Sequence, residues 1–169
     1  KNPSNALIYF SQGPYLEILA EVTMPALIRR YLRLIGHGRM VDTSDAVAGM
    51  PEGYSRVVFE ADREDFDRLK AICRERGVRT VTARISRKDP HGRRLACRCL
   101  CPDDWAIPMF VTRFAADTHR DAPHPNGITR MDRIEFEGTR TAVEICRLAG
   151  ADDLLACSVG AGAIRAEFV

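Results

Sequence analysis

The sequence predicts an α+β fold of repeated βαβββ-type units with mixed or antiparallel sheets. Two segments carry this prediction: SRVVFEADREDFDRLKAICRERG, residues 55–77, and DRIEFEGTRTAVEICRLAG, residues 132–150. Each contains an alternating strand, a tight turn, an amphipathic helix and a glycine, in that order. Further strand candidates follow each segment. We therefore interpret the chain as one structural unit used more than once.

The opening stretch NALIYFSQGPYLEILAEV, residues 5–22, predicts two strands joined by a turn at Gly13 and Pro14. Strands also follow the helix in each repeated segment. We therefore expect this pair to be the tail of a further unit, whose first strand and helix would precede Lys1.

A short amphipathic helix is predicted for residues 25–35, PALIRRYLRLI, where apolar side chains recur at helical spacing. Gly36 ends this pattern. Residues 37–53 contain Gly, Asp, Ser and Pro without clear periodicity. We predict a loop there, with room only for a short helical turn around Ser44 to Ala48.

The middle of the chain predicts a complete βαβββ unit. A β-branched strand at residues 55–61 precedes a helix at residues 62–76, with Asp62 as its N-cap and Gly77 as its C-cap. Three strands follow, with the turn KDPHG between the first two: residues 80–86, 94–100 and 107–114. The second repeated segment predicts a strand, a helix and two strands: residues 131–138, 139–148, 154–159 and 163–168.

These elements divide the chain into four parts. Residues 1–54 hold the remainder of a first unit and a helical linker, and residues 55–115 hold the complete βαβββ unit. Residues 116–127 form a connection that ends in HPNG, and residues 128–169 form a further βαββ unit.

The composition is that of a compact globular protein. Hydrophobic residues make up 46% of the chain, and 25 basic residues nearly balance 23 acidic ones, for a net charge of +2. This balance gives no reason to expect a nucleic-acid partner or an acidic membrane surface. No apolar run approaches the ~20 residues of a membrane span, so we expect no membrane partner.

Six cysteines raise the question of a disulfide or metal framework. Cys97, Cys99 and Cys101 lie two residues apart in ACRCLCP, and residues two apart on a strand point to the same face. Structural zinc sites usually place two residues between cysteines in a knuckle. We therefore predict reduced thiols in a cytoplasmic protein. If these three thiols face a cavity, they are candidate soft ligands or oxidation sites.

Several short motifs occur in an order that resembles the glyoxalase-like domain family of the vicinal oxygen chelate superfamily, which also includes glyoxalases, bleomycin-resistance proteins and dioxygenases. The motifs run from Asn5-Ala6-Leu7 and Tyr15-Leu16-Glu17, through Trp105 with Ile107-Pro108-Met109-Phe110, to His124-Pro125-Asn126-Gly127 and Ile164-Arg165-Ala166. The resemblance implies paired βαβββ units whose sheets curl around a cleft. It also suggests that about 40 residues, the size of one strand and helix start, precede Lys1 in the parent protein.

The resemblance implies a divalent metal, Fe²⁺, Mn²⁺, Ni²⁺ or Zn²⁺, held by His and Glu side chains with open positions for a substrate's vicinal oxygens. Glu17 matches the glutamate on the closing strand of the first unit. The alternative is that Glu17 points to solvent or pairs with a basic residue. Arg133 occupies a position where superfamily enzymes often carry a ligand His, and an arginine cannot bind a cation. A metal site in this chain therefore needs His124 or another group as a partner for Glu17.

His124 lies in the polar connection DAPHPNG, residues 121–127. It is a candidate ligand or general base at the mouth of the cleft. The alternative is a surface turn in which Asn126-Gly127 supplies a positive φ and His124 only caps it. We assign Glu17 and His124 as candidate catalytic residues.

A cleft without a metal could still bind a ligand. Arg113 and Arg133 could clamp a carboxylate or phosphate, with Tyr15, Trp105 and Phe110 as apolar walls. The alternative is that these aromatic side chains belong to the core and these arginines to the surface. Asn5 joins the ligand-binding candidates through its motif.

Two classes of function remain open at this point. One is a glyoxalase- or dioxygenase-like lyase, isomerase or oxygenase that acts on a small oxygenated metabolite. The other is a non-enzymatic binding or resistance protein that holds a small molecule in the same cleft. Fold alone cannot choose between them. A homodimer is a further expectation, because an incomplete first unit would leave an open sheet edge.

Overall fold

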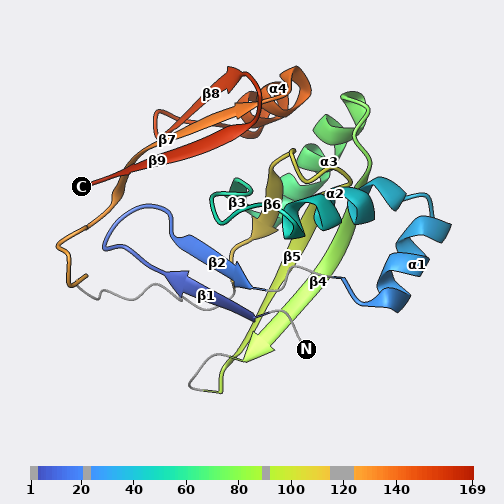
Figure 1. Cartoon of the computed structure of the whole chain (residues 1–169), viewed down its shortest axis with the longest axis horizontal. Helices are drawn as coiled ribbons and strands as arrows, with labels where there is room; N and C mark the ends of the chain where they lie inside the picture. The colour runs from blue at the N-terminus through green and yellow to red at the C-terminus, as the bar shows by residue number, and fades with distance from the viewer. Residues whose placement is uncertain (1–3, 21–23, 89–91, 115–123) are drawn as a thin grey trace.

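The structure is a computed structural model that describes residues 4–20, 24–88, 92–114 and 124–169 (Figure 1). The predicted KDPHG turn and the connection at residues 116–127 therefore lie partly outside the described residues. A two-stranded hairpin opens the described chain, with strands β1 (Ser4–Ile8) and β2 (Leu16–Ala20). Two helices follow, α1 (Ala26–Leu34) and α2 (Gly38–Ala48). The α+β fold class predicted from the sequence is confirmed.

The central sheet has four strands in the order β3-β6-β5-β4. Helix α3 (Phe66–Glu75) follows its first strand, and a 3₁₀ turn, η1 (Arg63–Asp65), precedes that helix. Strand β3 pairs in parallel with β6, and the pairs β6–β5 and β5–β4 are antiparallel. The strands are β3 (Val58–Ala61), β4 (Thr80–Lys88), β5 (Arg94–Pro102) and β6 (Met109–Thr112).

The third sheet has three strands in the order β8-β7-β9. Its strands are β7 (Met131–Gly138), β8 (Leu155–Val159) and β9 (Ala163–Phe168), and α4 (Arg140–Ala149) follows β7. Here the strand after the helix pairs directly with the strand before it, whereas in the central sheet the strand after the helix lies at the far edge. The two repeated segments thus share a strand and helix start but not a sheet order.

Both repeats bury their helices in one hydrophobic core. Residues of α3 and α4 pack together with Leu100 and Phe110 of the central sheet and with Phe136 and Leu155 of the third sheet. An ion pair between Arg76 and Glu144 joins the two helices at the surface. Sharing a core lets two small sheets bury more apolar area than either would bury alone.

The loop predicted for residues 37–53 is wrong over most of its length, because α2 occupies Gly38–Ala48. Tertiary contacts explain this helix. Its buried residues Met40, Val41 and Ser44 share one face, and Met40 and Val41 pack with Leu32 of α1. Ion pairs also join the two helices, Arg29 with Asp45 and Arg33 with Asp42. Contacts of this kind stabilise a helix whose own sequence carries a weak periodic signal.

The predicted N-cap residue Asp62 precedes the turn η1, and Asp65 is the N-cap residue of α3 itself. The turn η1 separates Asp62 from α3, and the Asp62 side chain makes no capping hydrogen bond. The predicted glycine at the other end is confirmed, since Gly77 has a φ of +72°, a conformation that other residues adopt at a cost.

Helix α1 leaves one apolar side exposed, with Leu27 82% and Leu34 76% accessible and Tyr31 between them. A second copy of the chain could cover such a surface, but the homodimer stays a prediction. None of the helices in the described ranges combines the length and apolarity needed to cross a membrane.

Candidate functional site

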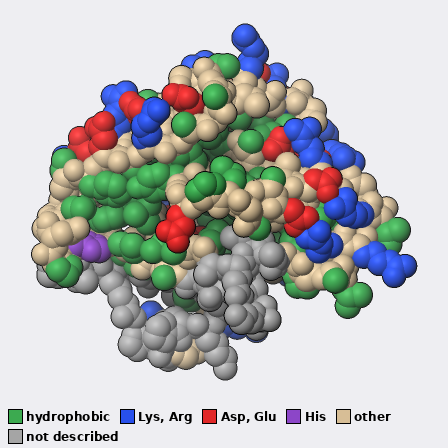
Figure 2. All heavy atoms as spheres, in the orientation of Figure 1, with side chains coloured by type: hydrophobic (Ala, Val, Ile, Leu, Met, Phe, Trp, Pro, Cys, Tyr) green, Lys and Arg blue, Asp and Glu red, His purple; other side chains and the backbone are tan. Residues whose placement is uncertain are grey.

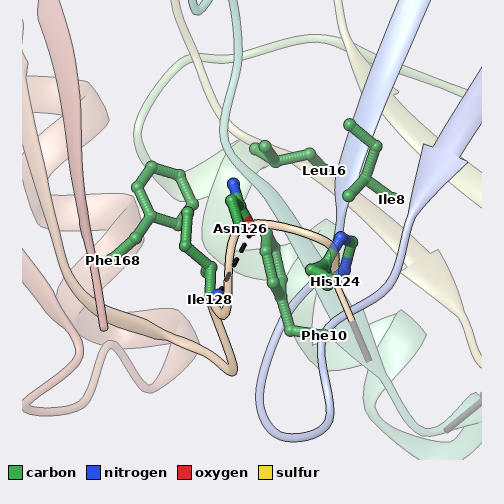
Figure 3. Close-up of a pocket in the computed structure, with 7 residues that line it drawn as sticks. All are labelled: Ile8, Phe10, Leu16, His124, Asn126, Ile128 and Phe168. Atoms are coloured by element: carbon green, nitrogen blue, oxygen red, sulfur yellow. Dashed lines mark hydrogen bonds between the residues drawn. The ribbon is translucent and has the colours of Figure 1, made fainter. Parts of the chain in front are cut away.

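A pocket of about 200 Å³ lies between the β1–β2 hairpin, the segment after residue 123 and the last strand (Figure 3). Its lining is mostly apolar, with His124 and Asn126 as the polar side chains among the described lining residues. The apolar lining residues are Ile8, Phe10, Leu16, Ile128 and Phe168. Figure 2 shows that hydrophobic side chains gather over this hairpin and the adjacent three-stranded sheet.

Backbone hydrogen bonds bring these distant segments together. The Gln12 amide at the hairpin tip donates to the Thr129 carbonyl, and the Thr129 amide donates to the carbonyl of Val169. Next to these bonds, the Ile128 amide donates to the side-chain oxygen of Asn126 at 3.3 Å (Figure 3). This hydrogen bond closes a turn at residues 126–128. Gly127 completes this turn with a φ of +77°, as the HPNG motif predicts.

His124 is half-buried and its ring position is determined by two contacts. The ring packs against Phe10, with the ring centroids 5.2 Å apart. Nε2 of His124 donates a hydrogen bond to the Tyr9 carbonyl at 2.5 Å. Because a carbonyl oxygen only accepts, Nε2 carries a proton, and Nδ1 holds the lone pair in the neutral ring. His124 is therefore more than the cap of a surface turn.

Glu17 lies on the other side of the hairpin from this pocket. Leu16 lines the pocket, and successive strand residues point to opposite faces, so Glu17 and Tyr15 face away from His124. Burial raises the pKa of the Tyr15 hydroxyl well above its usual range, and the carboxylates of Glu60 and Glu17 raise it further. Glu60 is on β3, so this side of the hairpin faces the central sheet.

Sulfur atoms cover part of the central-sheet face that Glu17 approaches. We call this surface the sulfur face; it consists of Cys97, Cys99, Cys101 and Met109. Cys97 Sγ lies 3.9 Å from Cys99 Sγ, and the Cys101 thiol donates to Met109 Sδ across β5 and β6 at 3.6 Å. The prediction that the three cysteines share one side of a sheet is confirmed.

Electrostatics connect the sulfur face with Glu17. Burial raises the pKa of the Cys99 thiol, and smaller contributions come from Cys97, Cys101 and Glu17. Burial also raises the pKa of Cys101, and the nearby Arg56 guanidinium opposes that shift. All six cysteines of the chain are thiols and none forms a disulfide, as predicted.

The described pocket residues do not fit the divalent metal centre that the family resemblance implies. The lining offers one imidazole and one amide, and the imidazole Nε2 already donates to Tyr9. Across the described ranges, no group of three or more His, Cys, Asp or Glu side chains is placed to hold a metal ion. The assignment of Glu17 and His124 as shared metal ligands stays a prediction.

Two of the predicted aromatic walls have structural roles. Phe110 has no exposed surface and stacks on Phe59 in the core, with ring centroids 5.6 Å apart. Trp105 is half-buried, and the Arg56 guanidinium lies 4.8 Å from its ring centroid. The same guanidinium donates to the Ile107 carbonyl, and burial lowers the pKa of Arg56 to about 10. Neither aromatic ring lines the pocket.

The remaining ligand-binding candidates are dispersed. Arg113 is exposed, and Arg133 is exposed and pairs with Glu135 on the same strand at 3.2 Å. Asn5 pairs with Leu19 through the strand register, and its side chain lies outside the described residues. The structure therefore brings His124 into a pocket and Tyr15 and Glu17 onto the sulfur face, and it does not bring all the candidates into one site.

Sequence reasoning missed most of the pocket. The lining residues Ile8, Phe10 and Phe168 are apolar residues in or next to predicted strands, and their pattern resembles that of any half-buried strand. Asn126 was recognised only as a turn residue. The HPNG motif is the sequence signal for this pocket. It identifies the polar lining residues His124 and Asn126 but not the apolar residues around them.

A model of the glyoxalase-like domain family matches residues 2–149 of the chain. The match includes the hairpin, the central sheet and His124, and it ends before β8 and β9, so Phe168 of the pocket lies beyond it. Searches of the curated proteins and of the solved structures found no significant match. The chain therefore belongs to the glyoxalase-like domain family, within the vicinal oxygen chelate superfamily.

Proposed function

We propose that this domain binds a small, largely apolar molecule in the pocket beside His124, with a hydrogen-bonding group of the ligand directed at the imidazole. One observation carries the proposal: the pocket has apolar walls on several sides and two polar side chains at one place, His124 and Asn126. Ligand sites commonly combine apolar walls with a few placed polar groups.

The volume of the pocket limits the size of the ligand. An apolar cavity of about 150 Å³ holds one benzene ring, so a pocket of about 200 Å³ suits a single substituted ring. The rings of Phe10 and Phe168 line the pocket and offer aromatic contacts to such a ligand. A larger metabolite would have to extend out of the pocket.

The hydrogen bonding of His124 determines which polar group a ligand should carry. With Nε2 engaged by the Tyr9 carbonyl, Nδ1 of the neutral ring can accept a hydrogen bond. A ring that carries a hydroxyl group would donate to it. Phenol is therefore a suitable probe, and benzene is its matched control without the hydroxyl.

The experiment follows the methyl NMR signals of Ile8, Leu16 and Ile128 in the full chain during titration with phenol and with benzene. We expect saturable shifts at these methyl groups. We also expect phenol to bind about five-fold more tightly than benzene, as one net hydrogen bond contributes about 1 kcal/mol. The variant His124→Phe should remove this preference.

Two substitutions test the location of binding. Ile128→Trp should fill the pocket and abolish the saturable shifts at Ile8 and Leu16. Val159→Trp, on an exposed strand position with 61% accessibility, is the control and should leave binding unchanged. Phenol shifts that survive Ile128→Trp, or that spread over the surface without saturation, would exclude this pocket as the ligand site.

The second candidate function is a glyoxalase- or dioxygenase-like enzyme, a lyase, isomerase or oxygenase that acts on an oxygenated metabolite. Family membership supports it, together with the position of the Glu17 carboxylate near Tyr15 and the sulfur face. Its test is elemental analysis of the full-length protein purified without chelators, beside a Glu17→Ala variant. Stoichiometric metal that disappears in the variant would favour the enzyme, and no metal in either protein would favour the binding domain.

A further inference from the structure

A pair of thiols on the sulfur face has no part in the proposed pocket. Cys97 and Cys99 are alternate residues of β5, and their Sγ atoms lie 3.9 Å apart. Cys97 is half-buried, whereas Cys99 is 2% exposed. The pair therefore joins one thiol that solvent can reach to one held in the interior.

The separation of the two sulfur atoms suits a shared metal ion. An ion with only two ligands lies on the line between them, so two thiolates at about 2.3 Å from the ion would be up to about 4.6 Å apart. The observed separation of 3.9 Å is shorter, so the two sulfurs would have to separate by less than about 1 Å. The two thiols thus need little movement to bind one ion together.

The number and type of donors select the ion. Zinc in structural sites takes four ligands, and the described residues provide no group of three or more His, Cys, Asp or Glu side chains for one ion. Hard divalent ions prefer oxygen ligands. A soft ion that accepts two sulfur ligands is the type that the pair can hold, and thiolate ligands favour monovalent copper among biological metals.

The surroundings add further soft character. Cys101 and Met109 form a second sulfur pair at the next position along the same face, 3.6 Å apart. The Glu17 carboxylate acts electrostatically on Cys99 and places a negative charge near the position of a bound cation.

We propose that Cys97 and Cys99 form a binding site for a soft, thiophilic monovalent ion such as Cu⁺. Binding forms two bonds between the ion and sulfur and releases the two thiol protons to solvent. The site is separate from the pocket beside His124, so it does not depend on the function proposed above.

The test titrates the reduced full chain with Cu⁺ held by the coloured chelator bicinchoninate, in the absence of oxygen. The unmodified protein is expected to remove one equivalent of Cu⁺ from the chelator. Cys97→Ser should weaken this binding by more than about 100-fold, because it removes a sulfur that binds the ion directly. Removing a residue that only hydrogen-bonds to a metal ligand typically costs roughly 10- to 100-fold. Cys99→Ala should give the same result.

Two variants serve as matched controls. Cys101→Ser makes the same chemical change on the same strand and the same face, and Cys157→Ser changes a half-buried thiol of β8 in the third sheet. Both should retain one equivalent of Cu⁺. Urea unfolding of every variant checks that loss of binding is not loss of structure, and half-buried Cys97 is the position at which the fold should tolerate serine.

The pH dependence gives a second readout that a change in folding would not imitate. If both thiols release protons, the affinity should rise with pH, by up to about 100-fold per unit. The proposal is overturned if the unmodified protein takes no Cu⁺ from the chelator, if Cys97→Ser retains it, or if Cys101→Ser loses it to the same extent.

Discussion

The two sides of the β1–β2 hairpin differ in how the chain assembles them. The pocket side combines the hairpin with residues 124–128 and with β9, two segments that each lie more than 100 residues from the hairpin in the sequence. The other side faces Cys97, Cys99 and Cys101, which alternate along a single strand. Adjacent residues of one strand, Leu16 and Glu17, contribute to the two different environments.

This difference shows why an alternating strand can serve two sites. Leu16 adds an apolar wall to a pocket whose polar group is an imidazole, and Glu17 adds a carboxylate to a surface of thiols. The family resemblance placed Glu17 and His124 in one metal site. Strand alternation instead directs Glu17 to the side of the hairpin opposite His124, next to the sulfur face.

The largest effect is expected for the core residue behind the sulfur face. Phe110→Ala should lower the free energy of unfolding by about 3–5 kcal/mol, because the removed ring is fully buried and leaves a cavity. Urea unfolding monitored by circular dichroism measures this loss. Phe10→Ala in the pocket wall is the comparison and should cost less, because the open pocket already lies on one side of that ring. A cost below about 1 kcal/mol for Phe110→Ala would contradict its assignment to the core.

An intermediate effect is expected at alkaline pH. Burial raises the pKa of Cys73 from near 9 to about 11, so the folded state holds this proton where the unfolded state loses it. The stabilisation is complete below pH 9 and is lost as pH rises through 11, for a total of up to about 2–3 kcal/mol. Cys73→Ala should flatten the dependence of unfolding free energy on pH in this window. An unchanged slope would show that other groups cause it.

The smallest effect is expected for Glu17→Gln, and it tests the separation of the two sides directly. Removing the charge should lower the pKa of Cys99, which the NMR shift of its Cβ carbon reports during an alkaline titration. Global stability should change by less than about 0.5 kcal/mol, since Glu17 is exposed. Phenol binding in the pocket should not change. A loss of phenol affinity in this variant would mean that the two sides act as one site.

Much of the architecture could be predicted from residue patterns. The strands at residues 55–61 and 131–138 and the helices after them follow from periodicity and terminal glycines, which are local signals. The same-face arrangement of Cys97, Cys99 and Cys101 also follows from strand geometry alone. Helix α2 could not be predicted, because buried contacts with α1 and ion pairs such as Arg33 with Asp42 stabilise it.

The sequence by itself determined the α+β class, the repeated strand and helix start, the reduced thiols and the importance of the HPNG turn. Tertiary structure alone decided the different strand orders of the two repeats, the burial of Phe110 and the pocket around His124. The physical reason is that the interactions behind these two sets of features act over different distances along the chain. Local backbone preferences act within a few residues, whereas strand pairing and side-chain packing depend on which distant segments meet. Glu17 illustrates this limit, because Cys99, on which its charge acts, lies more than 80 residues away in the chain.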